Sequence, residues 1–116
     1  MLKDCLSKLD EYDLKIESFV VPGAYELPLT AKSLCKNFDA VILLGCIIKG
    51  ETPHFEIISQ SISDNVLKTS LKEETPIIFG VLTTNNESEA KDRATSKGSE
   101  FAETALNFLD TLKKIK

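Results

Sequence analysis

The chain has 116 residues, of which 42% are hydrophobic, and carries a formal net charge of −4 at pH 7. A chain of this length is expected to fold as one domain that spans residues 1–116. Its basic residues are interspersed with acidic ones, which argues against a nucleic-acid-binding surface, and no apolar run reaches the roughly 18 residues of a membrane-spanning helix.

The cysteines suggest neither a disulfide framework nor a zinc site. Cys5, Cys35 and Cys46 are odd in number, far apart in sequence and without a CxxC pair. The first residues also lack the charged start and apolar block of a signal peptide. We therefore expect reduced thiols, no metal, and a soluble cytoplasmic protein.

The first third of the chain predicts helix, strand and helix. Residues 2–12 have apolar side chains at helical spacing, with charged residues between them. Residues 15–21 (KIESFVV) are β-branched and aromatic enough for a strand, which the following Pro-Gly pair ends. Residues 26–38 predict a second helix, with Pro28 in its first turn, where proline is tolerated.

The middle of the chain predicts a buried strand and a helix. Residues 40–46 (AVILLGC) form a continuous apolar run, which is typical of a parallel strand covered on both faces. A helix is expected over about 53–73. Its inner face is marked by Ile58, Ile62, Val66 and Leu71.

The remaining residues predict a third strand and a long helical region. The strand covers residues 76–84, and helical spacing of apolar residues resumes at Glu87. We expect an interruption around residues 95–99 (TSKGS), followed by an amphipathic helix to the C-terminus.

This order of elements predicts an α/β fold. Alternating strands and helices with short connections favour a flavodoxin-like, doubly wound parallel sheet in three α/β/α layers. Such domains normally begin with a strand that lies inside the sheet, whereas this chain begins with a predicted helix. We therefore expect the sheet to lack its first strand.

The only histidine lies in the loop after the second predicted strand. In GETPHF, Thr52 is a natural N-cap, Pro53 fits the first helical position and His54 falls in the first turn. Gly50, Glu51 and Thr52 then lie at the carboxyl end of a strand, where open α/β sheets bind ligands. The free N–H groups of a helix start also suit a phosphate.

Two interpretations of this histidine are about equally supported by the sequence. The positive end of the helix dipole favours the uncharged imidazole, which could accept or relay a proton near neutral pH. Alternatively, His54 is an ordinary solvated surface residue. Glu51 is open in the same way, either as a ligand contact or as a solvated loop acid.

Other candidate residues lie on or after the predicted strands. Ala24, Tyr25 and Glu26 follow the first one, and Glu26 either caps the next helix or binds ligand hydroxyls. Phe79 lies within an apolar strand and is core by default, although an aromatic ring can also stack on a planar heterocycle. From the residues alone, capping and core packing are the simpler interpretations.

Arg93 and Lys97 lie four residues apart on a predicted helix. This spacing is common on a charged helix face, but an arginine could also clamp a phosphate. Two other classes of site lack support. The chain has no GxSxG elbow of a serine hydrolase, and no Ser/Thr-rich phosphate loop of a flavodoxin-type flavin-binding module.

Four motifs are together similar to those of the lumazine synthases. They are VPGAYELP (21–28), GCIIKGETPHFE (45–56), PIIFGVLTTN (76–85) and KGSE (97–100), in the family's order and at nearly its spacing. The resemblance extends from about Leu2 to the C-terminus. It implies condensation of 5-amino-6-ribitylaminopyrimidinedione with 3,4-dihydroxy-2-butanone 4-phosphate to 6,7-dimethyl-8-ribityllumazine in riboflavin biosynthesis, without cofactor or metal.

The resemblance also implies roles for individual residues, and His54 becomes the proton-transfer residue. It further implies homo-oligomers, as pentamers, decamers or sixty-subunit shells, with each site between two subunits. The other contacts that it implies are to phosphate from Gly50, Glu51, Thr52 and a neighbouring subunit's Arg93, to the ribityl chain from Ala24, Tyr25 and Glu26, to the pyrimidine from Ile47, Ile48, Lys49 and an adjacent subunit's Phe79, and near the site from Lys97 and Glu100.

The chain departs from the family pattern in two places. The family's N-terminal segment, which supplies a central strand and an aromatic residue that stacks on the pyrimidine, is expected to be missing. About four residues, one helical turn, are also absent between the positions of Arg93 and Lys97. These departures keep a second function open, that of an assembly subunit without catalysis.

Overall fold

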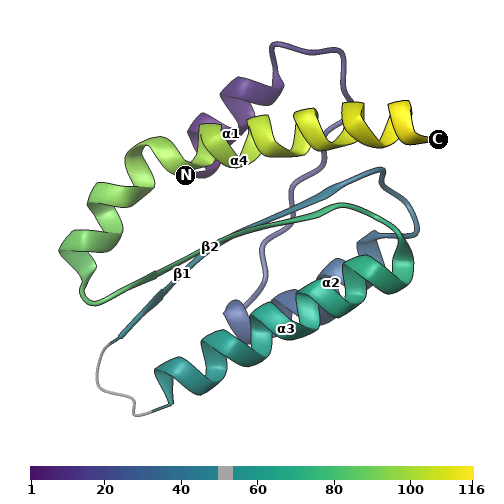
Figure 1. The fold of residues 1–116 in the computed structure, drawn as a ribbon. Helices are drawn as coiled ribbons and strands as arrows, with labels where there is room; N and C mark the ends of the chain where they lie inside the picture. Colours follow the sequence, from purple (N-terminus) through teal and green to yellow (C-terminus); the bar gives the residue numbers. More distant parts are fainter. Residues whose placement is uncertain (50–53) are drawn as a thin grey trace.

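The computed structural model describes residues 1–49 and 54–116. Helices α1 and α4 cover one face of a sheet, and α2 and α3 cover the other (Figure 1). These three layers confirm the predicted α/β fold. In chain order the elements are α1 (Leu2–Leu9), the 3-10 helix η1 (Ala24–Glu26), α2 (Leu27–Leu34), β1 (Val41–Ile48), α3 (Phe55–Glu73), β2 (Ile77–Thr84) and α4 (Glu87–Ile115).

Strands β1 and β2 are parallel and pair along their whole length. Successive side chains of a strand point to opposite faces. Val41 and Leu43 belong to the core cluster between the sheet and α2 and α3, whereas Ile42 and Leu44 pack against the cluster beneath α1 and α4. Because both faces are covered, the strand sequence is apolar at nearly every position, as predicted.

The prediction of a strand over residues 15–21 is wrong. Only β1 and β2 form the sheet of the described chain, and residues 15–21 make no backbone–backbone hydrogen bond with another described residue. Ile16 packs against the cluster beneath α1 and α4 and Val21 against the opposite one, so the segment crosses from one face of the sheet to the other. β-branched residues form a strand only where a neighbouring strand satisfies the backbone.

The predicted helices are otherwise correct in order, with differences at their ends. α1 ends at Leu9, short of the predicted 2–12, and α2 ends at Leu34, where 26–38 was predicted. On α3, Leu71 is 71% exposed and does not belong to the inner face. It lies five residues after the buried Val66, which is about 140° around the helix.

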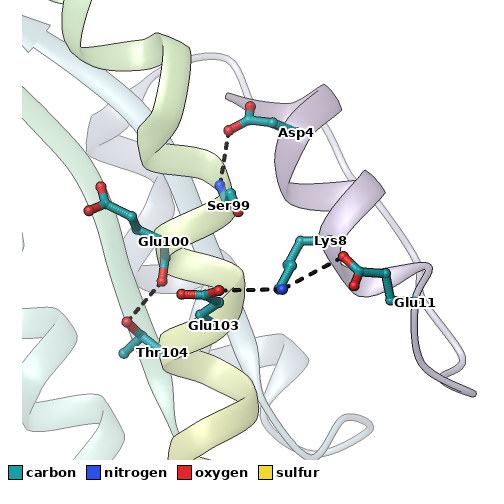
Figure 2. A network of polar contacts seen from close by, with 7 residues as sticks. All are labelled: Asp4, Lys8, Glu11, Ser99, Glu100, Glu103 and Thr104. Carbon is teal, nitrogen blue, oxygen red and sulfur yellow. Dashed lines mark hydrogen bonds and ion pairs between the residues drawn. The ribbon is translucent and has the colours of Figure 1, made fainter.

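Helix α4 is continuous, so the interruption predicted around residues 95–99 is wrong, but the helix bends where the N-terminus of the chain lies against it (Figure 1). The Ser99 N–H donates to the Asp4 carboxylate at 2.9 Å (Figure 2). A side chain that inserts into the backbone ladder in this way bends a helix without ending it. Gly98 permits the approach, because a Cβ there would collide with the Met1 carbonyl oxygen and the Asp4 carboxylate.

A second polar contact joins the same two helices. Lys8 Nζ on α1 lies 3.3 Å from Glu103 Oε1 on α4 and 3.7 Å from Glu11 Oε2 (Figure 2). Between the polar contacts, Cys5 is buried with Ala102 of α4. Helix α1 is therefore held on α4 by an apolar seam with charged groups along it.

We expect Asp4→Asn to loosen α1 from α4. Burial raises the pKa of the Asp4 carboxyl, but hydrogen bonds from Ser99 and from its own N–H, together with the N-terminal ammonium, bring the pKa below its ordinary value. A carboxyl with a lowered pKa in the folded state adds stability above its unfolded pKa of about 4, and this is lost as the pH falls through the folded pKa. The variant should lose about 1–2 kcal/mol of unfolding free energy at pH 7.

Urea unfolding of the wild type and Asp4→Asn at pH 7 and pH 3 measures this. The two proteins should differ at pH 7 and converge at pH 3. Asp110→Asn is the matched control, because Asp110 pairs with Lys114 on the same helix at 3.2 Å with both side chains largely exposed, and such pairs add little. An equal loss in both variants at pH 7 would contradict the assignment.

All three cysteines are free thiols. Burial raises the pKa of the Cys5 and Cys35 thiols, which keeps them protonated, whereas Cys46 is exposed. Among residues 1–49 and 54–116, no helix is long and apolar enough to cross a membrane, and no three histidine, cysteine or acidic side chains gather as metal ligands.

Candidate functional site

The carboxyl ends of β1 and β2 lie side by side. Ile47 and Ile48 stand opposite Thr83 and Thr84 in the register, and the Lys49 N–H donates to the Thr84 carbonyl oxygen at 2.7 Å. Because the strands are parallel, this is the edge at which open α/β sheets bind ligands. The structure thus places Ile47, Ile48 and Lys49 at the edge where the sequence predicts a site.

Arg93 reaches the same edge from α4. Its Nη1 donates to the Thr83 carbonyl oxygen at 3.3 Å. Asn86 starts the helix as its N-cap, since its side chain accepts from the Glu89 N–H at 2.8 Å. The Arg93 side chain is exposed, and this bond uses one of the five N–H donors of a guanidinium. The arginine therefore presents charge at the end of β2, where an anion could be held.

The residues predicted after the first strand form η1, which packs against β1 and α3. Ala24 contacts the core cluster beneath α2 and α3, whereas Tyr25 is 73% exposed. Glu26 occupies the N-cap position of α2, but its side chain makes no capping hydrogen bond. Its carboxylate lies toward Gly23, where a Cβ would be 3.3 Å from Oε2. The capping interpretation of this carboxylate is therefore wrong.

Phe79 lies in β2 opposite Leu43 and is half-buried against the core cluster beneath α2 and α3. It also lines an open groove of about 460 Å³ between α3 and β2, together with Phe55 and Ser59. The Ser59 hydroxyl oxygen is buried and has no hydrogen-bond partner in the described chain. Core packing and access to a groove thus both apply to Phe79.

His54 is the N-cap residue of α3, two positions nearer the helix than predicted. Its backbone (φ −97°, ψ 7°) lies outside the helical range, and its carbonyl oxygen accepts from the Ile58 N–H at 2.9 Å. The side chain is exposed. Thr52, predicted as the N-cap, lies outside the described residues, as do Gly50 and Glu51.

Lys97 and Glu100 pair with each other, with Nζ and Oε2 3.2 Å apart. In the described chain neither forms a hydrogen bond or ion pair with another candidate residue. Lys97 lies one turn beyond Arg93 on a continuous helix. A helix shortened by four residues turns its faces by only about 40°, so the deletion inferred from the resemblance keeps both cations on nearly the same side.

Thr84 is a residue of this edge that the sequence analysis missed. Its side chain is buried, its hydroxyl donates to the Asn86 carbonyl oxygen at 3.2 Å, and its Oγ1 lies 3.9 Å from Cys46 Sγ. The sequence pattern that could have identified it is a polar residue on the covered face of an apolar strand, directly before a helix N-cap. Such a residue needs a hydrogen-bond partner to be buried without a large cost.

The chain was compared with models of known protein families. Residues 1–113 match the family described as 6,7-dimethyl-8-ribityllumazine synthase. The match includes every candidate residue and nearly the whole chain of 116 residues, and it confirms the resemblance that four separate motifs carry. The chain therefore belongs to the 6,7-dimethyl-8-ribityllumazine synthase family.

Proposed function

We propose that the protein is a lumazine synthase, a transferase that condenses 5-amino-6-ribitylaminopyrimidinedione with 3,4-dihydroxy-2-butanone 4-phosphate to 6,7-dimethyl-8-ribityllumazine. The observation that carries the proposal is the meeting of Lys49 and Arg93 at the carboxyl edge of β1 and β2, in a chain that belongs to this family. That edge supplies cationic groups next to an apolar wall of Ile47 and Ile48.

The residue types suit the chemistry. An amine that attacks a ketone loses a proton and releases water, and ring closure requires further proton transfers. A residue positioned as general acid and base typically contributes about 10²–10⁴-fold, which is the role proposed for His54. Phosphate must be held and then released. The charged hydrogen bonds of a guanidinium contribute about 1.5–3 kcal/mol each, which is the role proposed for Arg93.

The substrate would extend from this edge over η1. The Glu26 carboxylate makes no capping bond and is proposed to accept hydrogen bonds from ribityl hydroxyls. The protein is proposed to act as a homo-oligomer, with Phe79 and Arg93 directed to a neighbouring subunit's site. The open groove beside Phe79 supports this proposal, because a neighbouring chain could cover it.

The direct test is product formation by this chain given both substrates, followed through the absorbance of the lumazine chromophore. We expect turnover that saturates with each substrate. A folded chain that yields no product at any substrate concentration would overturn the proposal. Folding is checked in the same samples by circular dichroism, so that an unfolded preparation is not mistaken for an inactive one.

A second function, that of an assembly subunit without catalysis, is favoured by one observation. Residues 15–21 are unpaired in the described chain and leave Phe19 58% and Val20 96% exposed, just before η1. An apolar surface of this kind suits contact with another chain. Sedimentation velocity distinguishes the two functions, because a defined oligomer without turnover would support the assembly subunit.

A further inference from the structure

Thr84, the last residue of β2, lies where three elements meet. Its carbonyl oxygen accepts from Lys49, directly after β1, at 2.7 Å. Its hydroxyl donates to the Asn86 carbonyl oxygen, directly before α4, at 3.2 Å. The side chain is 2% exposed, so this bond is made away from water. One residue therefore joins the ends of both strands to the start of α4.

The start of α4 determines where Arg93 lies. Asn86 caps the helix through the Glu89 N–H at 2.8 Å, and two turns later Arg93 folds back onto the Thr83 carbonyl oxygen at 3.3 Å. The Thr84 hydroxyl holds the residue from which this helix starts. Without the hydroxyl, the chain between β2 and α4 would retain its backbone path but lose a buried anchor, and the guanidinium could shift relative to Lys49.

We propose that Thr84 is a positioning residue for recognition of the phosphate-bearing substrate. The inference rests on the proposed function, in which Arg93 holds that phosphate. The Thr84 hydroxyl touches no substrate and acts through the placement of Arg93. A small displacement of a binding group weakens the contact that it makes, and here the weakening falls on one substrate only.

The chain contains a closely matched control. Thr75, just before β2, is 9% exposed, and its hydroxyl donates to the Glu73 carbonyl oxygen, also at 3.2 Å. It lies beside the Cys35 thiol, as Thr84 lies beside that of Cys46. Thr75→Val therefore removes the same kind of bond at the other end of the strand, away from every candidate residue.

The experiment measures kcat and the KM of each substrate for the wild type, Thr84→Val, Thr84→Ser and Thr75→Val. Thr84→Val should raise the KM of the butanone phosphate about three- to tenfold, the range for one lost hydrogen bond, with the pyrimidine KM and kcat changed by less than about twofold. Thr84→Ser keeps the hydroxyl and should restore the wild-type values. Thr75→Val should lower the melting temperature as much as Thr84→Val does, and leave both KM values unchanged.

A double-mutant cycle tests the route through the arginine. Arg93→Ala should raise the butanone phosphate KM by more than Thr84→Val does, and the double variant should bind no worse than Arg93→Ala alone. Additive losses would overturn the inference, as would equal KM changes in Thr84→Val and Thr75→Val, or a rise in both KM values in Thr84→Val.

A second readout keeps the inference separate from the proposed function. Titration calorimetry with inorganic phosphate should give weaker binding for Thr84→Val than for Thr75→Val, whether or not the wild type turns over. A wild type that binds phosphate without making product would overturn the proposed function and leave this difference to be measured. If Thr84→Val does not fold, Thr84→Ala replaces it, and phosphate binding equal to that of Thr75→Val would contradict the inference.

Discussion

His54→Ala should lower kcat for lumazine formation by about 10²-fold and leave the KM of both substrates nearly unchanged. The alanine removes a group that the proposed mechanism uses in proton transfer and that carries no binding role. The loss should lie at the lower end of the range for general acid–base catalysis, because the His54 side chain is exposed and water can partly replace it. Helix α3 should remain intact, since its N-cap is not a side-chain hydrogen bond.

Two further measurements distinguish proton transfer from a structural role of His54. Added imidazole should restore part of the activity of His54→Ala, because an exposed position admits a small base. His54→Gln keeps a polar side chain of similar length but cannot relay a proton, so it should be as slow as His54→Ala and insensitive to imidazole. Unchanged turnover in both variants would remove the histidine from the mechanism.

The part of the site that the sequence predicts correctly is set by local order. An apolar run of eight residues can only be a covered strand, and whatever follows it must lie at the carboxyl edge of the sheet. This is why Ile47, Ile48 and Lys49 are found where the motif spacing places them. The same argument locates Thr83 and Thr84, although their importance depends on Arg93, which is brought back by a helix that starts two residues later.

The incorrect predictions depend on contacts between distant parts of the chain. Residues 15–21 have the composition of a strand, but a strand forms only beside another strand, and composition does not reveal the neighbour. The glycine and serines of residues 95–99 resemble a helix break. They remain helical because Asp4, at the other end of the chain, supplies a partner for the Ser99 N–H. Thr84 was missed for the same reason, since its role lies in hydrogen bonds to a different element.

Gly80→Ala should destabilise the fold by more than Asp4→Asn does. Gly80 lies in β2 on the face covered by α4, and a Cβ there would be 2.6 Å from the Leu43 carbonyl oxygen, 2.7 Å from Phe101 Cδ2 and 3.0 Å from Leu44 Cδ2. The first of these atoms belongs to the backbone of the paired strand and cannot move without disturbing the sheet. Overpacking of this kind costs about 1–3 kcal/mol, and a loss near the upper end should lower the melting temperature by about 10 °C.

Gly45→Ala in the neighbouring strand is the matched control. A Cβ at Gly45 would be 3.8 Å from Leu27 Cδ1 and 3.8 Å from Val81 Cγ2, which is ordinary van der Waals contact. With no clash, the alanine restricts the unfolded chain and should change the stability by less than about 1 kcal/mol, in the stabilising direction. Thermal unfolding of both variants therefore separates the loss of any glycine from the closeness of α4 to β2. If the two melt at the same temperature, α4 does not pack as closely on β2 as the structure has it, and the placement of Arg93 at the sheet edge loses its structural basis.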